Sequence, residues 1–184
     1  VCSSDLYWSK TSVSSGSNLS NLKLIGLNIL STNEELNFYL AKNYDDLIDH
    51  PIALGEFQIA HWQSNGVPHT MAIQGCVHEI DLERIAKDLQ AICTSTINLF
   101  EPKTKQAPFG QYLFLVNAVL AGYGGLEHRD STALLCRRDQ IPQIHTPLDE
   151  ASYREFLGLC SHEYFHAWLV KRIQPAAFQP YQLD

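Results

Sequence analysis

Basic residues are scarce in this sequence. Charged side chains make up 18% of its 184 residues, and 13 Lys and Arg stand against 20 Asp and Glu, which gives a net charge of −7. Because nucleic-acid affinity depends on basic side chains that neutralise phosphates, a nucleic-acid partner is not expected. Apolar residues amount to 45%, which excludes intrinsic disorder for most of the length and permits a packed core.

Long apolar runs and a cysteine framework are also lacking. The longest strongly apolar stretch, Tyr112 to Tyr123, is shorter than the roughly 20 residues that span a bilayer, and Asn117 and Gly122 interrupt it. The 5 cysteines are odd in number and widely spaced, which favours reduced, buried thiols over disulfides. We therefore expect no transmembrane segment and a cytoplasmic setting.

Strand-like patterns dominate the first part of the chain. Residues 1–20 are rich in serine and are expected to be loose, whereas 22–30 and 35–41 are compatible with short strands. Two apolar runs, Phe57 to Trp62 and Val67 to Ile73, flank an Asn-Gly pair, and these two residues tolerate the positive φ angles of tight turns. This pattern predicts a β-hairpin.

The apolar spacing changes after Gly75. Apolar residues recur every three or four positions from Asp81 to Phe100, which predicts a helix with one buried face. Residues 112–120 are nearly all apolar, as in a strand covered on both faces. Residues 126–138 are expected to form an exposed strand, followed by a turn near 139–147. This order of elements indicates an α+β or mixed α/β architecture.

A second helix is expected near the end of the chain. It is predicted to begin near Thr146-Pro147 or at a capping box, Ser152 to Glu155, and to run to about Ile173. Lys171 and Arg172 would then interact favourably with the negative C-terminal end of the helix.

The string HEYFH, residues 162–166, lies in this second helix. Positions four apart on a helix are neighbours, so His162 and His166 can direct their imidazoles to one metal ion. Glu163 lies beside them, where a carboxylate can take a proton from a metal-bound water and deliver it to a leaving amine. The spacing is typical of zinc peptidases.

A chance match on a buried amphipathic helix is the alternative interpretation of this string. Catalytic zinc normally has three protein ligands plus water, and no Glu or His follows His166 in the chain. A histidine extension of the metzincin type is also lacking. We therefore expect a Glu beyond Asp184 as the third ligand, and a chain that is a fragment.

Three segments of the sequence resemble one known family. Residues 162–175 resemble the HE[FY]FHxWxVKRIxP signature of the glycyl aminopeptidase family, which are gluzincin-type zinc metallopeptidases with a PDZ domain. Residues 124–132 resemble that family's GGLEHxxS/T strand, and 44–51 with 55–57 resemble its YDxLxDxP and GxF segments. The resemblance covers about Tyr44 to Tyr181.

The resemblance implies a fold and a domain organisation. The fold would be α+β, with a partial N-terminal β-rich domain in residues 1–75, of which 1–20 are loose. The N-terminal half of a thermolysin-like catalytic domain would follow in residues 76–184. A helical region and the PDZ domain are expected outside the chain.

The resemblance also implies roles for individual residues. The two histidines of the HEYFH string would bind Zn²⁺, and Glu163 would be the general base. Glu127 would pair with the free α-ammonium group of the substrate, although without the resemblance it reads as a solvated acid on an edge strand. Apart from the resemblance, the glycines Gly122, Gly124 and Gly125 are expected to let backbone or substrate approach closely. His128 would help to orient substrate, but on a strand it points to the face opposite to Glu127.

The expected function is therefore a zinc-dependent aminopeptidase that removes small N-terminal residues, such as Gly or Ala, from peptides. One alternative is a catalytically inactive remnant or peptide-binding module with the same fold. A second alternative keeps the peptidase chemistry but makes it endoproteolytic. Peptides are the expected partners, and the sequence does not indicate an oligomeric state.

Overall fold

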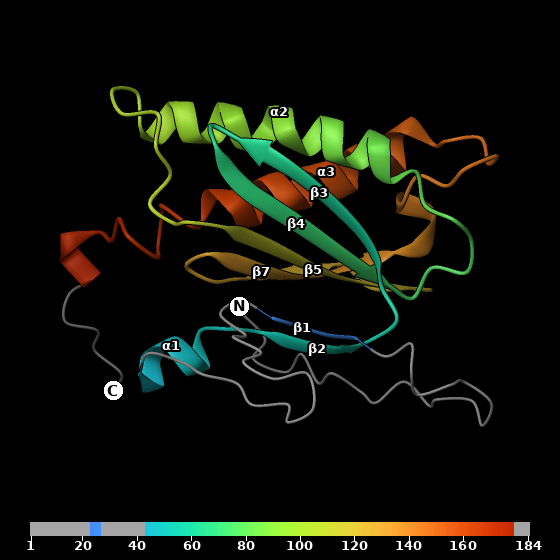
Figure 1. Ribbon diagram of the computed structural model, residues 1–184, viewed down its shortest axis with the longest axis horizontal. Helices are drawn as coiled ribbons and strands as arrows, with labels where there is room; N and C mark the ends of the chain where they lie inside the picture. Colours follow the sequence, from blue (N-terminus) through green and yellow to red (C-terminus); the bar gives the residue numbers. More distant parts are fainter. Residues whose placement is uncertain (1–22, 27–42, 179–184) are drawn as a thin grey trace.

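The computed structural model describes residues 23–26 and 43–178. These residues form three layers, in which two helices cover one face of a five-stranded sheet and a small two-stranded sheet lies on the other side (Figure 1). The spatial order of the large sheet is β3-β4-β5-β7-β6, and its strands are, in chain order, Gln58–Ser64, Val67–Gln74, Tyr112–Val119, Gly124–Glu127 and Ser131–Arg137. The three central strands are mutually parallel, whereas the edge strands β3 and β6 are antiparallel to their neighbours.

The small sheet pairs β1 (Lys23–Gly26) with β2 (Ile52–Gly55) in antiparallel orientation. The short helix α1 (Tyr44–Ile48) precedes β2 and lies beside this layer (Figure 1). Ala53 of β2 is buried in a small apolar cluster with Leu113 and Leu115 of β5. This cluster joins the two sheets.

The central strand β5 is covered on both faces, as predicted. Its residues Tyr112, Phe114 and Val116 belong to the main core, which also includes the buried residues of the two helices. Leu113 and Leu115, which alternate with them, point to the β2 side. All five side chains are at most 4% exposed, so the continuous apolar run follows from burial on both faces.

The helices begin at side-chain caps. α2 spans Leu82–Phe100, as predicted, and the Asp81 carboxylate accepts a hydrogen bond from the Arg84 N–H at 3.0 Å. α3 spans Glu150–Phe165, and Asp149 caps it by accepting from the Ala151 N–H at 3.0 Å. Neither predicted start is therefore correct, because the N-cap lies between the two.

α3 ends at Phe165, and the prediction that it continues to about Ile173 is wrong. Val170 has a φ of 88°, which no α-helix contains, and the Ile173 N–H donates to the Trp168 carbonyl at 2.7 Å within the turns that follow. Ala167 and Trp168 remain buried in these turns. The apolar pattern therefore continues past the helix end, and spacing alone could not show where the helix stops.

Two hairpins frame the large sheet. The predicted hairpin is confirmed as β3 and β4, and Asn65 and Gly66 at its tip have φ angles of 49° and 79°. The expectation of one exposed strand over residues 126–138 is wrong. β6 and β7 form a second antiparallel hairpin there, and β7 is mostly buried because it lies between β5 and β6.

The α+β fold class is confirmed. The boundary between two domains after residue 75 stays a prediction. β4 precedes that boundary and β5 follows it, and the two strands pair directly in one sheet. The predicted strand at 22–30 contains β1, whereas the expectations for 1–20 and 35–41 lie outside the described residues. Within the part of the chain that the structure describes, no helix has the length and apolar character required to cross a membrane.

Candidate active site

The HEYFH residues form the C-terminal end of α3. His162 and His166 lie on one side of the helix, with their Nε2 atoms 3.0 Å apart and their rings nearly perpendicular at 88°. The Nδ1 atom of His166 lies 3.2 Å from the Leu169 carbonyl oxygen. A proton on Nδ1 satisfies that carbonyl and leaves Nε2 available to a metal ion, which is the usual arrangement around histidine ligands.

Glu163 is buried against strand β6. Its side chain is 5% exposed, and its Oε2 atom has no hydrogen-bond partner among the described residues. A Cβ atom placed on Gly125 of β6 would overlap the Glu163 carboxyl group. Glycine at position 125 is therefore what allows the strand to approach the glutamate so closely.

The environment of Glu163 favours its neutral form. Burial raises the pKa of the Glu163 carboxyl group, while the charges of His162 and His166 lower it and the charge of Glu127 raises it further. A buried carboxyl group that lacks a hydrogen-bond partner is costly in a fold. Such groups are concentrated at functional sites, where a raised pKa makes a carboxylate a better base near neutral pH.

Glu127 and His128 lie at the end of β6. Glu127 is the last residue of the strand and is partly buried, and its charge acts on Glu163. His128 is 8% exposed, and its Nδ1 atom lies 3.7 Å from Asp49 Oδ1. The structure thus brings Gly125 and Glu127 to Glu163, and His128, which also acts on Glu163 by its charge, has Asp49 as a second neighbour. Substrate contacts of all three residues stay predictions.

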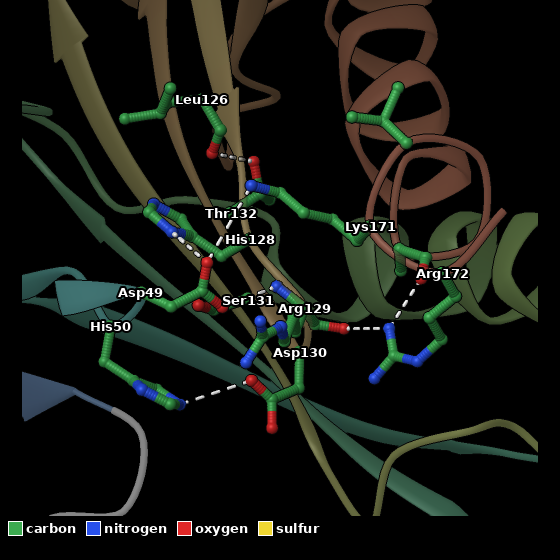
Figure 2. A network of polar contacts seen from close by, with 12 residues as sticks. Asp49, His50, Leu126, His128, Arg129, Asp130, Ser131, Thr132, Lys171 and Arg172 are labelled. Atoms are coloured by element: carbon green, nitrogen blue, oxygen red, sulfur yellow. Dashed lines mark hydrogen bonds and ion pairs between the residues drawn. The ribbon is translucent and has the colours of Figure 1, made fainter. Parts of the chain in front are cut away.

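A polar network joins the β6–β7 turn to the segment ahead of β2 (Figure 2). Asp49 Oδ2 accepts a hydrogen bond from the Arg129 N–H at 3.0 Å, and His50 Nε2 lies 3.2 Å from Asp130 Oδ1. Lys171 Nζ, from the turns after α3, lies 3.8 Å from Asp49 Oδ1. Sequence reasoning gave Asp49 no role, because the hydrogen bond to Arg129 joins positions 80 residues apart.

Arg172 ties the turns after α3 to the same region. Its guanidinium donates to the carbonyl oxygens of Arg129 at 2.7 Å, Ala167 at 2.5 Å and Pro108 at 3.3 Å. It also lies over the Phe109 ring, 5.7 Å from the centroid. Because α3 ends before these turns, Arg172 connects three backbone segments instead of serving mainly as a partner of the helix dipole.

The side of α3 opposite to the histidines is anchored in the core. The Tyr164 hydroxyl and His69 Nε2 are 2.9 Å apart, and His69 Nδ1 lies 2.8 Å from the Val67 carbonyl oxygen. The Trp168 Nε1–H donates to Glu101 at 3.1 Å. His69 is thus a buried histidine with a partner at each ring nitrogen.

These residues fit a zinc ion. Two imidazole nitrogens converge, the ring of His166 is oriented by a carbonyl group, and a buried carboxylate with a free oxygen lies next to them in sequence. The described residues contain no cluster of three or more His, Cys, Asp or Glu side chains that could hold a metal. Zinc binding and the third ligand therefore stay predictions.

Comparisons with known proteins bear on this site. Residues 155–184, which include the HEYFH string, match the family model described as M61 glycyl aminopeptidase. The crystal structure of an aminopeptidase N family protein from Idiomarina loihiensis is similar over 89% of this chain, with 41% sequence identity and a TM-score of 0.76. The chain spans 27% of the length of that protein. A search of curated proteins gave no match.

Proposed function

We propose that this chain carries catalytic residues of a zinc-dependent aminopeptidase. Its substrates would be peptides with small N-terminal residues such as Gly or Ala. The match of residues 155–184 to the glycyl aminopeptidase family model and the similarity to an aminopeptidase N family structure support this proposal. The observation that carries the proposal is the convergence of His162 and His166, with Nε2 atoms 3.0 Å apart, beside the buried Glu163, whose Oε2 atom has no hydrogen-bond partner within the described part of the chain.

Glu163 moves the protons of the reaction. His162, His166 and a third ligand would hold a zinc ion, which would supply Lewis acidity to the scissile carbonyl and to the attacking water. The Glu163 carboxylate accepts the proton of that water and passes it to the leaving amine. Its burial at 5% exposure keeps bulk water from competing for this proton.

Glu127 selects the free N-terminus of the substrate. A partly buried carboxylate at the end of an edge strand can pair with an α-ammonium group. An acylated N-terminus would leave that carboxylate without a partner, so blocked peptides are rejected. Gly125 lets β6 approach the Glu163 carboxyl group closely. His128, whose Nδ1 atom lies 3.7 Å from Asp49 Oδ1, would help to orient the substrate.

A cytoplasmic location of the protein is part of the same proposal. Cys76, Cys93, Cys136 and Cys160 are free thiols, three of them buried, which is compatible with a reducing cytoplasm. The thermolysin-like catalytic domain and the PDZ domain expected from the resemblance belong to the proposed whole protein.

The test is peptidase activity of the full-length protein that contains this chain. We would measure release of p-nitroaniline from the Gly and Ala p-nitroanilides before chelation, after chelation and after readdition of zinc. Turnover that chelation abolishes and zinc restores is the expected result. Absence of turnover in a protein that also lacks bound zinc would instead support a non-catalytic remnant. Cleavage of N-acetylated peptides at internal bonds would support an endopeptidase.

A further inference from the structure

The strand that carries Glu127 is short and lies at the edge of the sheet. β6 is four residues long, and among the described residues its strand partner is β7. Gly124 and Gly125 have no side chains, and Gly125 packs with its backbone against the Glu163 carboxyl group of α3. Glu127 is its last residue, so the position of the Glu127 carboxylate depends on the turn that follows.

The backbone of that turn is held from two directions (Figure 2). The Arg129 N–H donates to the Asp49 carboxylate at 3.0 Å, and the Arg129 carbonyl accepts from Arg172 at 2.7 Å. Asp49 comes from the segment ahead of β2, and Arg172 comes from the turns that follow the helix with the two histidines. The residue two positions after Glu127 is thus fixed relative to both segments.

Asp49 also links these segments by charge. Its Oδ1 atom lies 3.7 Å from His128 Nδ1 and 3.8 Å from Lys171 Nζ. Burial raises the pKa of the Asp49 carboxyl group, but His128, the Arg129 N–H and Lys171 together lower it to about 2. The carboxylate therefore carries its full charge near neutral pH, and hydrogen bonds to charged groups are stronger than neutral ones.

The spacing between Glu127 and the histidines has a chemical consequence. If Glu127 holds the α-ammonium group of the substrate, the separation between Glu127 and the two histidines that would hold the metal decides which peptide bond is cleaved. A small displacement of either group moves the substrate out of its reactive position. A residue that fixes the end of β6 therefore affects catalysis without touching the substrate.

We propose that Asp49 is a positioning residue for Glu127. By holding the Arg129 N–H and the ring of His128, it fixes the end of β6 at the distance from His162 and His166 that places the first peptide bond of the substrate for cleavage. This inference rests on the proposed function, because it acts through the pairing of Glu127 with the substrate ammonium group.

A double-mutant cycle on the zinc-loaded full-length protein tests the inference. We would measure kcat/KM for glycine p-nitroanilide in the wild type, Asp49→Ala, Glu127→Gln and the double variant. Asp49→Ala is expected to lower kcat/KM roughly tenfold, the usual worth of a hydrogen bond to a charged group. In the Glu127→Gln background the same change is expected to have little further effect, because residues that act through one another are not additive.

Control variants separate positioning from loss of stability. Asp45→Ala removes the same charge from the exposed surface of α1 and should leave kcat/KM unchanged. Asp49→Asn keeps an oxygen that can accept from Arg129 and should lose less activity than Asp49→Ala. Hydrogen exchange over residues 128–131 should be faster in Asp49→Ala, with zinc content unchanged.

The outcomes distinguish this inference from the proposed function. An equal loss from Asp49→Ala in both backgrounds would show a general structural role and overturn the positioning role. Wild-type activity in Asp49→Ala would overturn it as well while leaving the aminopeptidase intact. Wild-type activity in Glu127→Gln would contradict the proposed binding of the ammonium group, and with it the inference.

Discussion

Gly125 lies directly against the carboxyl group of Glu163, at a position where a Cβ atom would overlap that group. The contact joins an edge strand to the helix of the HEYFH string, and it leaves the Glu163 side chain 5% exposed. A backbone without a side chain is therefore part of what places the proposed general base.

We predict that Gly125→Ala lowers kcat of the proposed peptidase by roughly 10²-fold, because the added methyl group displaces the Glu163 carboxylate from the attacking water. Zinc content should stay at the wild-type level, since Glu163 is not a metal ligand in the proposal. Steady-state kinetics on glycine p-nitroanilide and metal analysis provide the two measurements.

Gly124→Ala is the matched control for this prediction. A Cβ atom on Gly124 would have no neighbouring heavy atom within 4 Å, so its kcat should resemble that of the wild type. Equal losses in the two alanine variants would show that a side chain is harmful at either glycine of β6, and that the contact with Glu163 has no special importance.

We predict that Glu163→Gln retains zinc and loses turnover. The amide keeps the size of the side chain but cannot take a proton from water, so kcat should fall by roughly 10²- to 10⁴-fold. Glu155→Gln, a change at an exposed position of the same helix, should have a much smaller effect. Full activity of Glu163→Gln would remove the general-base assignment.

Local patterns predicted the histidine pair and much of the secondary structure. The four-residue spacing of His162 and His166 needs only one helical turn to bring the two rings together, and the structure places their Nε2 atoms 3.0 Å apart. The helix over residues 82–100 and the hairpin at Asn65 were equally local, because they depend on apolar spacing and on turn residues.

Contacts between distant residues could not be predicted in the same way. Asp49 and Arg129 are 80 positions apart, and His69 and Tyr164 are 95 apart, so no short-range pattern pairs them. The contact of Gly125 with Glu163 depends on how a strand packs on a helix. The end of α3 was misplaced because Trp168 stays buried after the helix has ended.

We predict that Glu127→Gln weakens the preference for free N-termini. The loss of the negative charge removes the ion pair with the α-ammonium group, so the ratio of kcat/KM for Gly-Ala-Ala-Ala over its N-acetylated form should fall by roughly tenfold or more. Liquid chromatography of the cleavage products checks this ratio. Glu79→Gln, at an exposed position with the same charge change, should leave the ratio unaltered.

The stability of the fold should depend on pH through His69. This side chain is 1% exposed, and burial lowers its pKa to about 4, although a hydrogen bond to the Val67 carbonyl opposes the shift. The ordinary pKa of a histidine, as in the unfolded chain, is 6.5. Above that pH His69 is neutral in both states and does not destabilise the fold. As the pH falls from 6.5 towards 4, His69 becomes protonated in the unfolded chain but stays neutral in the folded one. The free energy of unfolding should therefore drop by up to about 3 kcal/mol.

Urea unfolding at several pH values, followed by tryptophan fluorescence, measures this dependence, because Trp62 stacks on His69 with ring centroids 5.5 Å apart. His69→Gln should be less stable at neutral pH, since it disturbs the contact with the Tyr164 hydroxyl, but its stability should change less between pH 6.5 and 4.5. His61→Gln, at an exposed position on β3, should keep the wild-type slope. A slope that persists unchanged in His69→Gln would assign the acid sensitivity to other groups.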